Sequence, residues 1–253
     1  MEVRCLTTGV VRPKRGDRGV RRYLPGGWSA ETLPVNAFLV EHSGGLCLFD
    51  TGQAAEAAEP GYFPRWHPFF RLSRFELGPE DEAAAQLARL GVSPTDVRLV
   101  VLSHLHTDHV GGIGAFTGAE IVVSRLEWEA AAGLRGRLRG YLPERMPAAL
   151  RPRLVEIDGP PLGPFKASLD LRGDGRLLLV PTPGHTAGHL SLLIEEEGRR
   201  YLLGGDLAHS QAHLEVVSPE ISSFCREGSV TFLAAHDSRA VALLGGQTVP
   251  VPR

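Results

Sequence analysis

The feature that most constrains this chain is a buried strand that runs directly into a cluster of histidines. Residues Arg98 to Ser103 (RLVVLS) form a continuous apolar run, which is typical of a strand buried on both faces. The next six residues, His104 to His109 (HLHTDH), contain three imidazoles and one carboxylate. Zinc and related metals select these two kinds of ligand, so the segment predicts a metal site at the end of a strand.

The spacing within this cluster predicts two ions rather than one. Side chains two positions apart at a strand end point the same way, so His104 and His106 face one point. Asp108 and His109 follow once the chain turns toward Gly111, and they can face a second point nearby. The alternative is a solvated polar loop with chance histidines, which the density of ligands argues against.

The same pattern of a strand followed by a polar turn recurs later in the chain. His185 lies in PTPGHTAGH, Asp206 in LLGGD and His236 in LAAHD. With the first cluster they make two sets of three ligands and a bridge: His104, His106 and His185; Asp108, His109 and His236; and Asp206. Asp206 is assigned the bridge because a carboxylate has two oxygens, whereas a neutral imidazole cannot bridge.

Composition excludes several classes of protein. The 253 residues carry 27 Lys+Arg against 29 Asp+Glu, so no overall field attracts nucleic acid or anionic lipid. Three widely spaced cysteines form no CxxC motif, which excludes a zinc ribbon and a thioredoxin-like site. No apolar run suits a signal peptide or a membrane span, so we expect a cytoplasmic enzyme. Without a repeat or linker, residues 1–253 are expected to form a single domain.

Other elements are predicted from local pattern. The runs 35–40 and 46–49 predict a hairpin, and the segments 79–90 and 125–140 are each predicted to be helical. Further short apolar runs predict strands at 120–124, 177–180, 190–194, 201–203 and 230–233.

An aromatic segment interrupted by prolines follows the first hairpin. Its candidate substrate contacts are Phe63, Trp66, Phe69 and Phe70. Repeated prolines exclude a regular element, so these rings either cover the core or form a lid over a pocket.

Five motifs in this order resemble the metallo-β-lactamase superfamily: FDTG, HxHxDH, TPGHTxGH, a GD after a strand, and a final HD. The resemblance runs from about Pro34 to Leu244. It implies an α/β fold, an αβ/βα four-layer sandwich of two mixed β-sheets flanked by helices, with the metal site at one sheet edge. It also implies the ligand roles assigned above.

Within the superfamily, the chain is most similar to the quorum-quenching N-acyl homoserine lactone lactonases. Thr51, SHLHTDHVGGIGAF and PTPGHTAGHLSLLI carry this likeness, whereas His109 argues against the secreted antibiotic-degrading class. The likeness implies a dinuclear-zinc hydrolase in which a metal-bound hydroxide opens the lactone ring. Iron, cobalt and manganese are left open as the native metals. The aromatic segment lies where such lactonases keep their acyl-chain contacts.

Asp108 is expected to be both a metal ligand and a proton shuttle. Two other features depart from the lactonase pattern. Three residues after Asp206, where lactonases commonly carry a tyrosine that contacts the substrate carbonyl, this chain has His209, an alternative hydrogen-bond donor that titrates near neutral pH. The interval from Asp206 to His236 is short for the family, so a differently shaped cleft and a different final ligand are both alternatives.

Competing functions use the same metal pair. They are an arylesterase or organophosphate hydrolase, and a thioester hydrolase, for which no cationic binding patch is evident. A redox protein with two irons would require a glutamate ligand and usually a flavin domain, and neither is present. The expected partner is a small lactone or ester, with no nucleic acid and no membrane, and a homodimer is left open.

Overall fold

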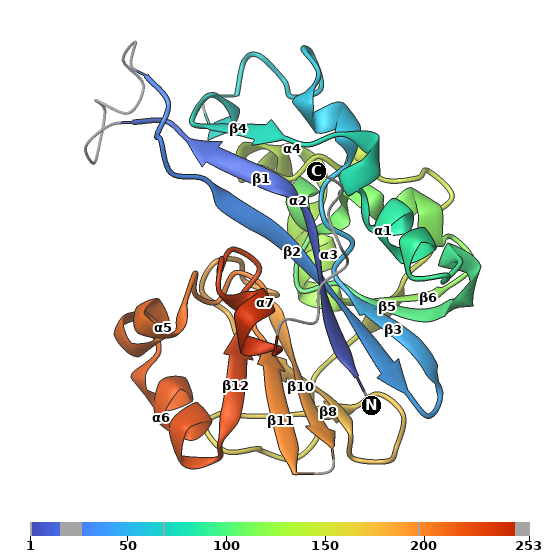
Figure 1. The fold of residues 1–253 in the computed structure, drawn as a ribbon, viewed down its shortest axis with the longest axis vertical. Helices are drawn as coiled ribbons and strands as arrows, with labels where there is room; N and C mark the ends of the chain where they lie inside the picture. Colours follow the sequence, from blue (N-terminus) through green and yellow to red (C-terminus); the bar gives the residue numbers. More distant parts are fainter. Residues whose placement is uncertain (1, 16–26, 68, 197, 246–253) are drawn as a thin grey trace.

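The computed structural model describes residues 2–15, 27–67, 69–196 and 198–245, in which two β-sheets pack face to face (Figure 1). The first sheet has the spatial order β4 (Ser73–Glu76), β1 (Val3–Pro13), β2 (Leu33–His42), β3 (Gly45–Phe49), β5 (Val97–Val101), β6 (Glu120–Ser124) and β7 (Arg153–Val155). The second has the order β12 (Val230–Leu233), β11 (Arg199–Leu203), β10 (Leu190–Glu196), β9 (Leu177–Pro181) and β8 (Leu169–Asp170). Both contain parallel and antiparallel pairs, as predicted.

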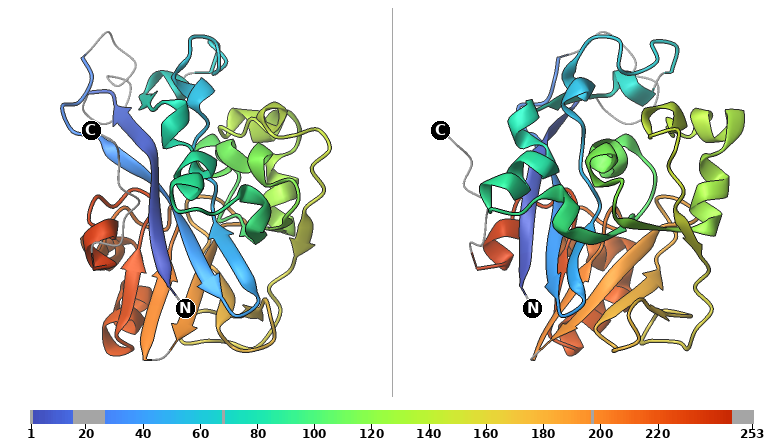
Figure 2. Two further views of the ribbon diagram at one scale, coloured as in Figure 1. Left: turned by 45° about the vertical axis from the view of Figure 1, so that its right-hand side comes forward. Right: turned by 90° about the vertical axis from the view of Figure 1, so that its right-hand side faces the viewer.

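Helices cover the outer faces of both sheets. On the first sheet and its flank they are α1 (Ala83–Arg89), α2 (Thr107–Val110), α3 (Arg125–Ala131) and α4 (Gly133–Leu138). On the second they are α5 (Gln211–Val217) and α6 (Pro219–Glu227), while α7 (Ala240–Leu243) contacts β1 and β12. The views of Figure 2 place α5 and α6 away from the other group of helices. The expected αβ/βα four-layer sandwich is confirmed.

Alternation along the strands explains why the layers form. In β10, Leu190, Leu192 and Ile194 enter the core between the sheets, whereas Leu193 packs toward α5 and α6. In β2, Phe38 likewise faces the second sheet while its neighbours face the helices. Because successive side chains of a strand point to opposite faces, an apolar run buries both sides of a sheet.

Two local expectations need correction. The helical stretch 125–140 is two helices, because Gly133 adopts a φ of +67° that ends α3 and reorients the chain. The N-terminal strand β1 was not predicted, since charged residues interrupt its pattern; in the structure Arg12 pairs with Glu76 of β4 at 2.7 Å.

The short interval between Asp206 and His236 still holds two helices. Ser210 caps α5 by accepting a hydrogen bond from the His213 amide, and Pro219 begins α6 immediately afterwards. A compact pair of helices therefore fills the interval without displacing His236 from the sheet edge.

Two further findings concern composition. The cysteines Cys5, Cys47 and Cys225 are buried and free, and burial raises the pKa of the Cys5 and Cys47 thiols to about 12. Among the residues that the structure describes, no helix combines the length and apolar character needed for a membrane crossing.

Replacing Gly52 by Ala is expected to cost about 2–3 kcal/mol of unfolding free energy. Gly52 has a φ of +67°, and an added Cβ would lie 2.0 Å from Thr8 Oγ1. Gly133 has the same φ with nothing within 4 Å of an added Cβ, so G133A should cost about 1 kcal/mol. Denaturant unfolding of both variants measures the difference, and equal losses would contradict the steric argument.

Candidate metal centre

Five chain segments meet at one edge of the sandwich. Asp50 follows β3, residues 103–109 follow β5, and His185 lies in the loop after β9. Asp206 follows β11 and His236 follows β12. Because β3 is parallel to β5 and β11 to β12, their carboxyl ends lie at common edges, which brings polar residues from distant parts of the sequence together.

The structure brings all seven predicted ligands together. They form three overlapping groups whose donor atoms lie within 4.8 Å of one another: His104, His106 and His185; His104, His109 and Asp206; and Asp108, His109 and His236. Asp206 belongs to the group that shares His104 with one of the other groups and His109 with the other. This position between the two is the one expected of a bridging carboxylate.

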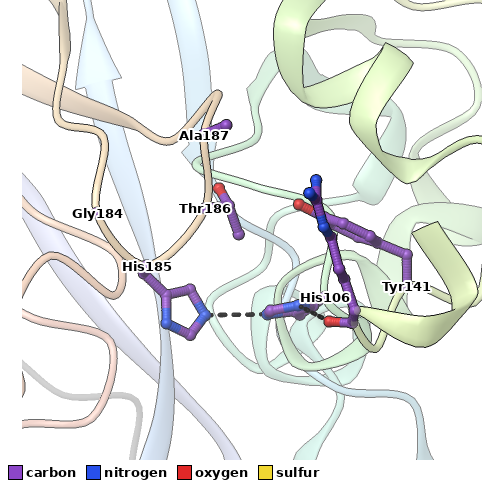
Figure 3. Close-up of a pocket in the computed structure, with 7 residues that line it drawn as sticks. His106, Tyr141, Gly184, His185, Thr186 and Ala187 are labelled. Carbon is purple, nitrogen blue, oxygen red and sulfur yellow. Dashed lines mark hydrogen bonds between the residues drawn. The ribbon is translucent and has the colours of Figure 1, made fainter. Parts of the chain in front are cut away.

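In the first group three ring nitrogens converge. His106 Nε2 lies 3.2 Å from the carbonyl oxygen of Arg139, which can only accept, so Nε2 carries the proton (Figure 3). The unprotonated Nδ1 of His106 therefore faces His104 Nε2 at 3.1 Å and His185 Nε2 at 3.0 Å. These three nitrogens lie close enough together to hold one cation.

Asp50 and Ser103 orient two further imidazoles. The Asp50 carboxylate accepts hydrogen bonds from the Ser103 amide at 2.7 Å, the Ser103 hydroxyl at 2.8 Å and His109 Nδ1 at 2.8 Å. Since the Ser103 hydroxyl donates to Asp50, it accepts from His104 Nδ1 at 3.0 Å. Both histidines consequently direct Nε2 into the site, the orientation that a metal ligand requires.

The second group contains buried polar atoms without hydrogen bonds. His109 Nε2 and Asp206 Oδ1 are 3.3 Å apart, fully buried, and unsatisfied. His236 donates from Nδ1 to the carbonyl oxygen of Pro34 at 2.7 Å, and its Nε2 lies 3.3 Å from Asp206 Oδ1 and 3.6 Å from Asp108 Oδ2. These inward-facing donors fit divalent transition metals, for which imidazole and carboxylate are suitable ligands.

The electrostatics of the site favour positive charge. Burial lowers the pKa of His104 well below its usual value. Burial also acts to lower the pKa of His109, but the carboxylates of Asp206 and Asp50 raise it well above its usual value. Against the same effect of burial, the carboxylate of Asp206 raises the pKa of His236 to about 9. The carboxylates thus stabilise a cation here, whether a proton or a metal ion.

Comparison with known proteins decides the family, since the family model described as metallo-beta-lactamase superfamily matches residues 30–244. The chain belongs to the metallo-β-lactamase superfamily. The match begins and ends close to the limits, Pro34 and Leu244, that the sequence motifs indicated.

Individual relatives of this superfamily member are mostly hydrolases by name. It is 34% identical to the N-acyl homoserine lactonase AttM of Rhizobium radiobacter over 72% of this chain and 68% of that protein. It is 37% identical to a probable metallo-hydrolase of Mycobacterium tuberculosis over 72% of this chain and 59% of that protein. The superfamily member is accordingly a metal-dependent hydrolase.

A solved structure confirms the fold. An N-acyl homoserine lactone hydrolase, with the product N-hexanoyl-L-homoserine bound at its catalytic metal centre, superposes with a TM-score of 0.70. The match covers 94% of each chain at 24% sequence identity, so it concerns the architecture.

Sequence reasoning missed the part played by Glu127. This fully buried carboxylate accepts hydrogen bonds from the Leu105 amide, the Tyr141 hydroxyl and the Gly188 amide. It therefore ties the HLHTDH turn to α3 and to the loop that carries His185. Its only local signal is its place in the first turn of α3, three residues after the N-cap Ser124.

Two further aspartates, Asp50 and Asp237, differ in what their carboxylates contact. Asp50 contacts His109, whereas the carboxylate of Asp237 binds Arg239 at 3.1 Å and caps the turn before α7. Asp237 nonetheless lies beside β2, because its backbone oxygen accepts a hydrogen bond from Asn36 Nδ2.

An apolar pocket of about 220 Å³ opens onto the metal-binding cluster. Its lining comprises Val11, Pro13, Leu33, Phe70, Ser73 and Phe75 on one side, and His106, Thr107, Asp108, His185, Asp206, His209 and His236 on the other. Strands β1, β2 and β4 supply most of the apolar side, which the sequence pattern does not indicate because it does not predict β1. The pocket joins an apolar surface to the reactive cluster.

The four aromatic candidates have different places. Phe70 lines the apolar pocket, and Phe63 stacks against it at 4.7 Å between ring centroids and supports it from behind. Trp66 is 55% exposed and does not line the pocket, so its expected contact with the substrate stays a prediction. Phe69 begins a short 3₁₀ helix, Phe69–Arg71, but its side chain lies outside the described part of the structure.

His209 lies at the edge of the cluster. It lines the apolar pocket, its ring centroid is 5.7 Å from that of His236, and it stacks on His213 at 5.2 Å. Burial and then the positive charge of His236 lower the pKa of His209. A neutral His209 ring at neutral pH has one N–H to donate into the pocket.

His189 is expected to make the metal-free protein sensitive to acid. Its Nδ1 donates to Thr182 Oγ1 at 2.8 Å, its Nε2 accepts from the Asp206 amide at 3.1 Å, and burial lowers its pKa to about 3. In the unfolded chain His189 takes up a proton near pH 6.5. The contribution of the neutral, buried His189 to the free energy of unfolding is therefore fully present above that pH and is lost as pH falls toward 3.

The measurement compares wild type with H189Q, both metal-free, by denaturant unfolding between pH 7 and pH 4. The wild type should lose up to about 1.4 kcal/mol per pH unit more than H189Q. Parallel curves would contradict a neutral, buried His189.

Proposed function

We propose that this superfamily member is a lactonase that opens the ring of N-acyl homoserine lactones and so acts in quorum quenching. The observation that carries the proposal is the apolar pocket, in which Val11, Leu33 and Phe70 face the metal-binding cluster across a space suited to an acyl chain. Support also comes from relatives named N-acyl homoserine lactonase at about one-third identity.

The metal pair is proposed to consist of zinc ions held by the seven ligands, with Asp206 between them. When bound, such a pair supplies an activated water molecule and polarises the ester carbonyl. The chain itself supplies the preorganised ligands, since Asp50, Ser103 and the Arg139 carbonyl fix the imidazole protons before any metal arrives.

Asp108 and His209 are proposed to serve the reacting ester. Both line the apolar pocket. An oxygen of the Asp108 carboxylate takes a proton from the attacking water and passes it to the leaving alkoxide oxygen, which yields the hydroxy acid. His209 donates its N–H to the carbonyl oxygen, on which negative charge develops.

Hydrolysis of butanoyl, hexanoyl, octanoyl and decanoyl homoserine lactones by the zinc-loaded protein tests the proposal. We expect activity that rises with chain length, and a variant F70A that loses this preference while the shortest lactone is hydrolysed as before. The W66A variant is a matched control, since the exposed Trp66 does not line the pocket. Failure to hydrolyse any lactone would reject the proposal.

The second candidate is an arylesterase, organophosphate or thioester hydrolase that uses the same ligands. The stacked rings of Phe63, Phe70 and Phe75 favour an aromatic substrate, because they offer a flat apolar wall. Activity on phenyl acetate, paraoxon or an acyl thioester without lactonase activity would establish this candidate instead.

A further inference from the structure

A second pocket reaches the predicted metal ligands from another direction. Its volume is about 460 Å³, and it is lined by His106, Arg139, Tyr141, Gly184, His185, Thr186 and Ala187. Figure 3 shows His106 and Tyr141 on one side and the loop from Gly184 to Ala187 on the other. We call it the arginine pocket. His106 and His185 also line the apolar pocket, so one bound molecule can extend into both.

Among the described residues of this lining, Arg139 supplies the only charged side chain besides the histidines. Its carbonyl oxygen accepts the hydrogen bond from His106 Nε2, which fixes its backbone beside a metal ligand. In the described part of the chain no carboxylate forms an ion pair with Arg139, whereas the nearby Arg137 is 3.3 Å from Glu144. The guanidinium is exposed and available to a ligand.

The nearest buried acid is already satisfied. Glu127 accepts hydrogen bonds from the Tyr141 hydroxyl at 2.8 Å, the Leu105 amide at 3.1 Å and the Gly188 amide at 3.2 Å. Tyr141 and Arg139 line the same pocket. Because the Tyr141 hydroxyl donates its hydrogen bond to Glu127, Arg139 is the group left to bind a negative charge.

We propose that the arginine pocket binds an oxyanion, a carboxylate or a phosphate, carried by the substrate on the side away from its apolar chain. The inference rests on the proposed ester hydrolysis and extends it to anionic esters. A planar guanidinium matches either group with two parallel hydrogen bonds. A lactone ring at the ligands and an acyl chain in the apolar pocket would leave this space to a further substituent.

The first test measures binding without turnover. Zinc-loaded protein is titrated calorimetrically with glutarate, with its monoamide, and with 4-phosphonobutyrate. Wild type should bind one of the two dianions about fivefold more tightly than the monoamide, a ratio within the range of single exposed ion pairs. The preferred dianion identifies the carboxylate or the phosphate as the group recognised. R139Q should remove the preference, and R139E should reverse it.

The control is R135Q, since Arg135 is exposed on α4 and does not line the pocket. It should keep the preference of the wild type. An equal affinity for dianions and monoamide in the wild type, or a preference that survives R139Q, would overturn the inference.

A second test compares kcat/KM for phenyl esters of glutaric acid and of its monoamide. The ratio should fall about fivefold in R139Q and stay constant in R135Q. Lactone hydrolysis with no dependence on Arg139 would leave the proposed function intact and reject the oxyanion site. Arg139-dependent binding in a protein that hydrolyses no ester would support the oxyanion site and reject the proposed function.

Discussion

Replacing Asp206 by Asn is expected to lower the metal content of the protein and to reduce turnover at least about 1,000-fold, which corresponds to about 4 kcal/mol. Asp206 Oδ1 lies 3.3 Å from both His109 Nε2 and His236 Nε2, and Oδ2 lies 3.4 Å from His185 Nε2. An amide offers one oxygen in place of two and carries no charge. It therefore cannot present a negatively charged oxygen to the histidines on both sides of the site, as the Asp206 carboxylate does.

Metal content measured by plasma mass spectrometry after reconstitution, with turnover of a lactone or an aryl ester, tests this expectation. D158N is the control, because Asp158 is an exposed carboxylate that belongs neither to the metal-binding groups nor to the lining of the apolar pocket. Circular dichroism verifies that D206N is folded. A folded D206N protein with wild-type metal content would show that Asp206 does not join the two ligand groups.

The ligands could be predicted from the sequence because they lie in polar segments that come soon after strands. A run such as 98–103 identifies its own strand, and the polar residues after it must lie at the sheet edge whatever the rest of the chain does. The prediction that His104 and His185 bind the same ion then required only that their strand ends lie close together. The fold implied by the resemblance to the superfamily meets this requirement.

What the sequence concealed depends on contacts between distant residues. Strand β1 carries Arg4 and Arg12, which look unsuited to a sheet until Glu41 of β2 and Glu76 of β4 are placed beside them. Glu127 reads as a surface residue of a helix, yet it is fully buried because three donors from separate segments surround it. Neither role has a local pattern.

The aromatic segment shows the same limit. Its prolines exclude a regular element, and without periodicity nothing distinguishes the inward ring of Phe70 from the exposed ring of Trp66. Only the position of β4 against β1, set by pairs such as Phe75 with Val11, decides which ring reaches the pocket.

Asp108 allows a sharper test of mechanism than Asp206 does. It is partly exposed to the apolar pocket, and its Oδ2 lies 3.6 Å from His236 Nε2, so it can act both on a metal and on the substrate. D108N is expected to retain most of the bound metal, because its amide oxygen remains a ligand and the other six ligands are unchanged. Turnover of a lactone should fall about 10²- to 10⁴-fold, the usual contribution of a positioned proton donor.

The leaving group separates proton transfer from metal binding in D108N. An alkoxide expelled from a lactone needs a proton, whereas 4-nitrophenolate leaves without one, so the loss should be much smaller for 4-nitrophenyl acetate. Steady-state kinetics on both substrates with metal-assayed protein measures this difference. Equal losses would assign Asp108 to metal binding alone. Near-wild-type lactone turnover in metal-replete D108N would reject the proton-shuttle role, because no other described carboxylate of the cluster is as open to the apolar pocket.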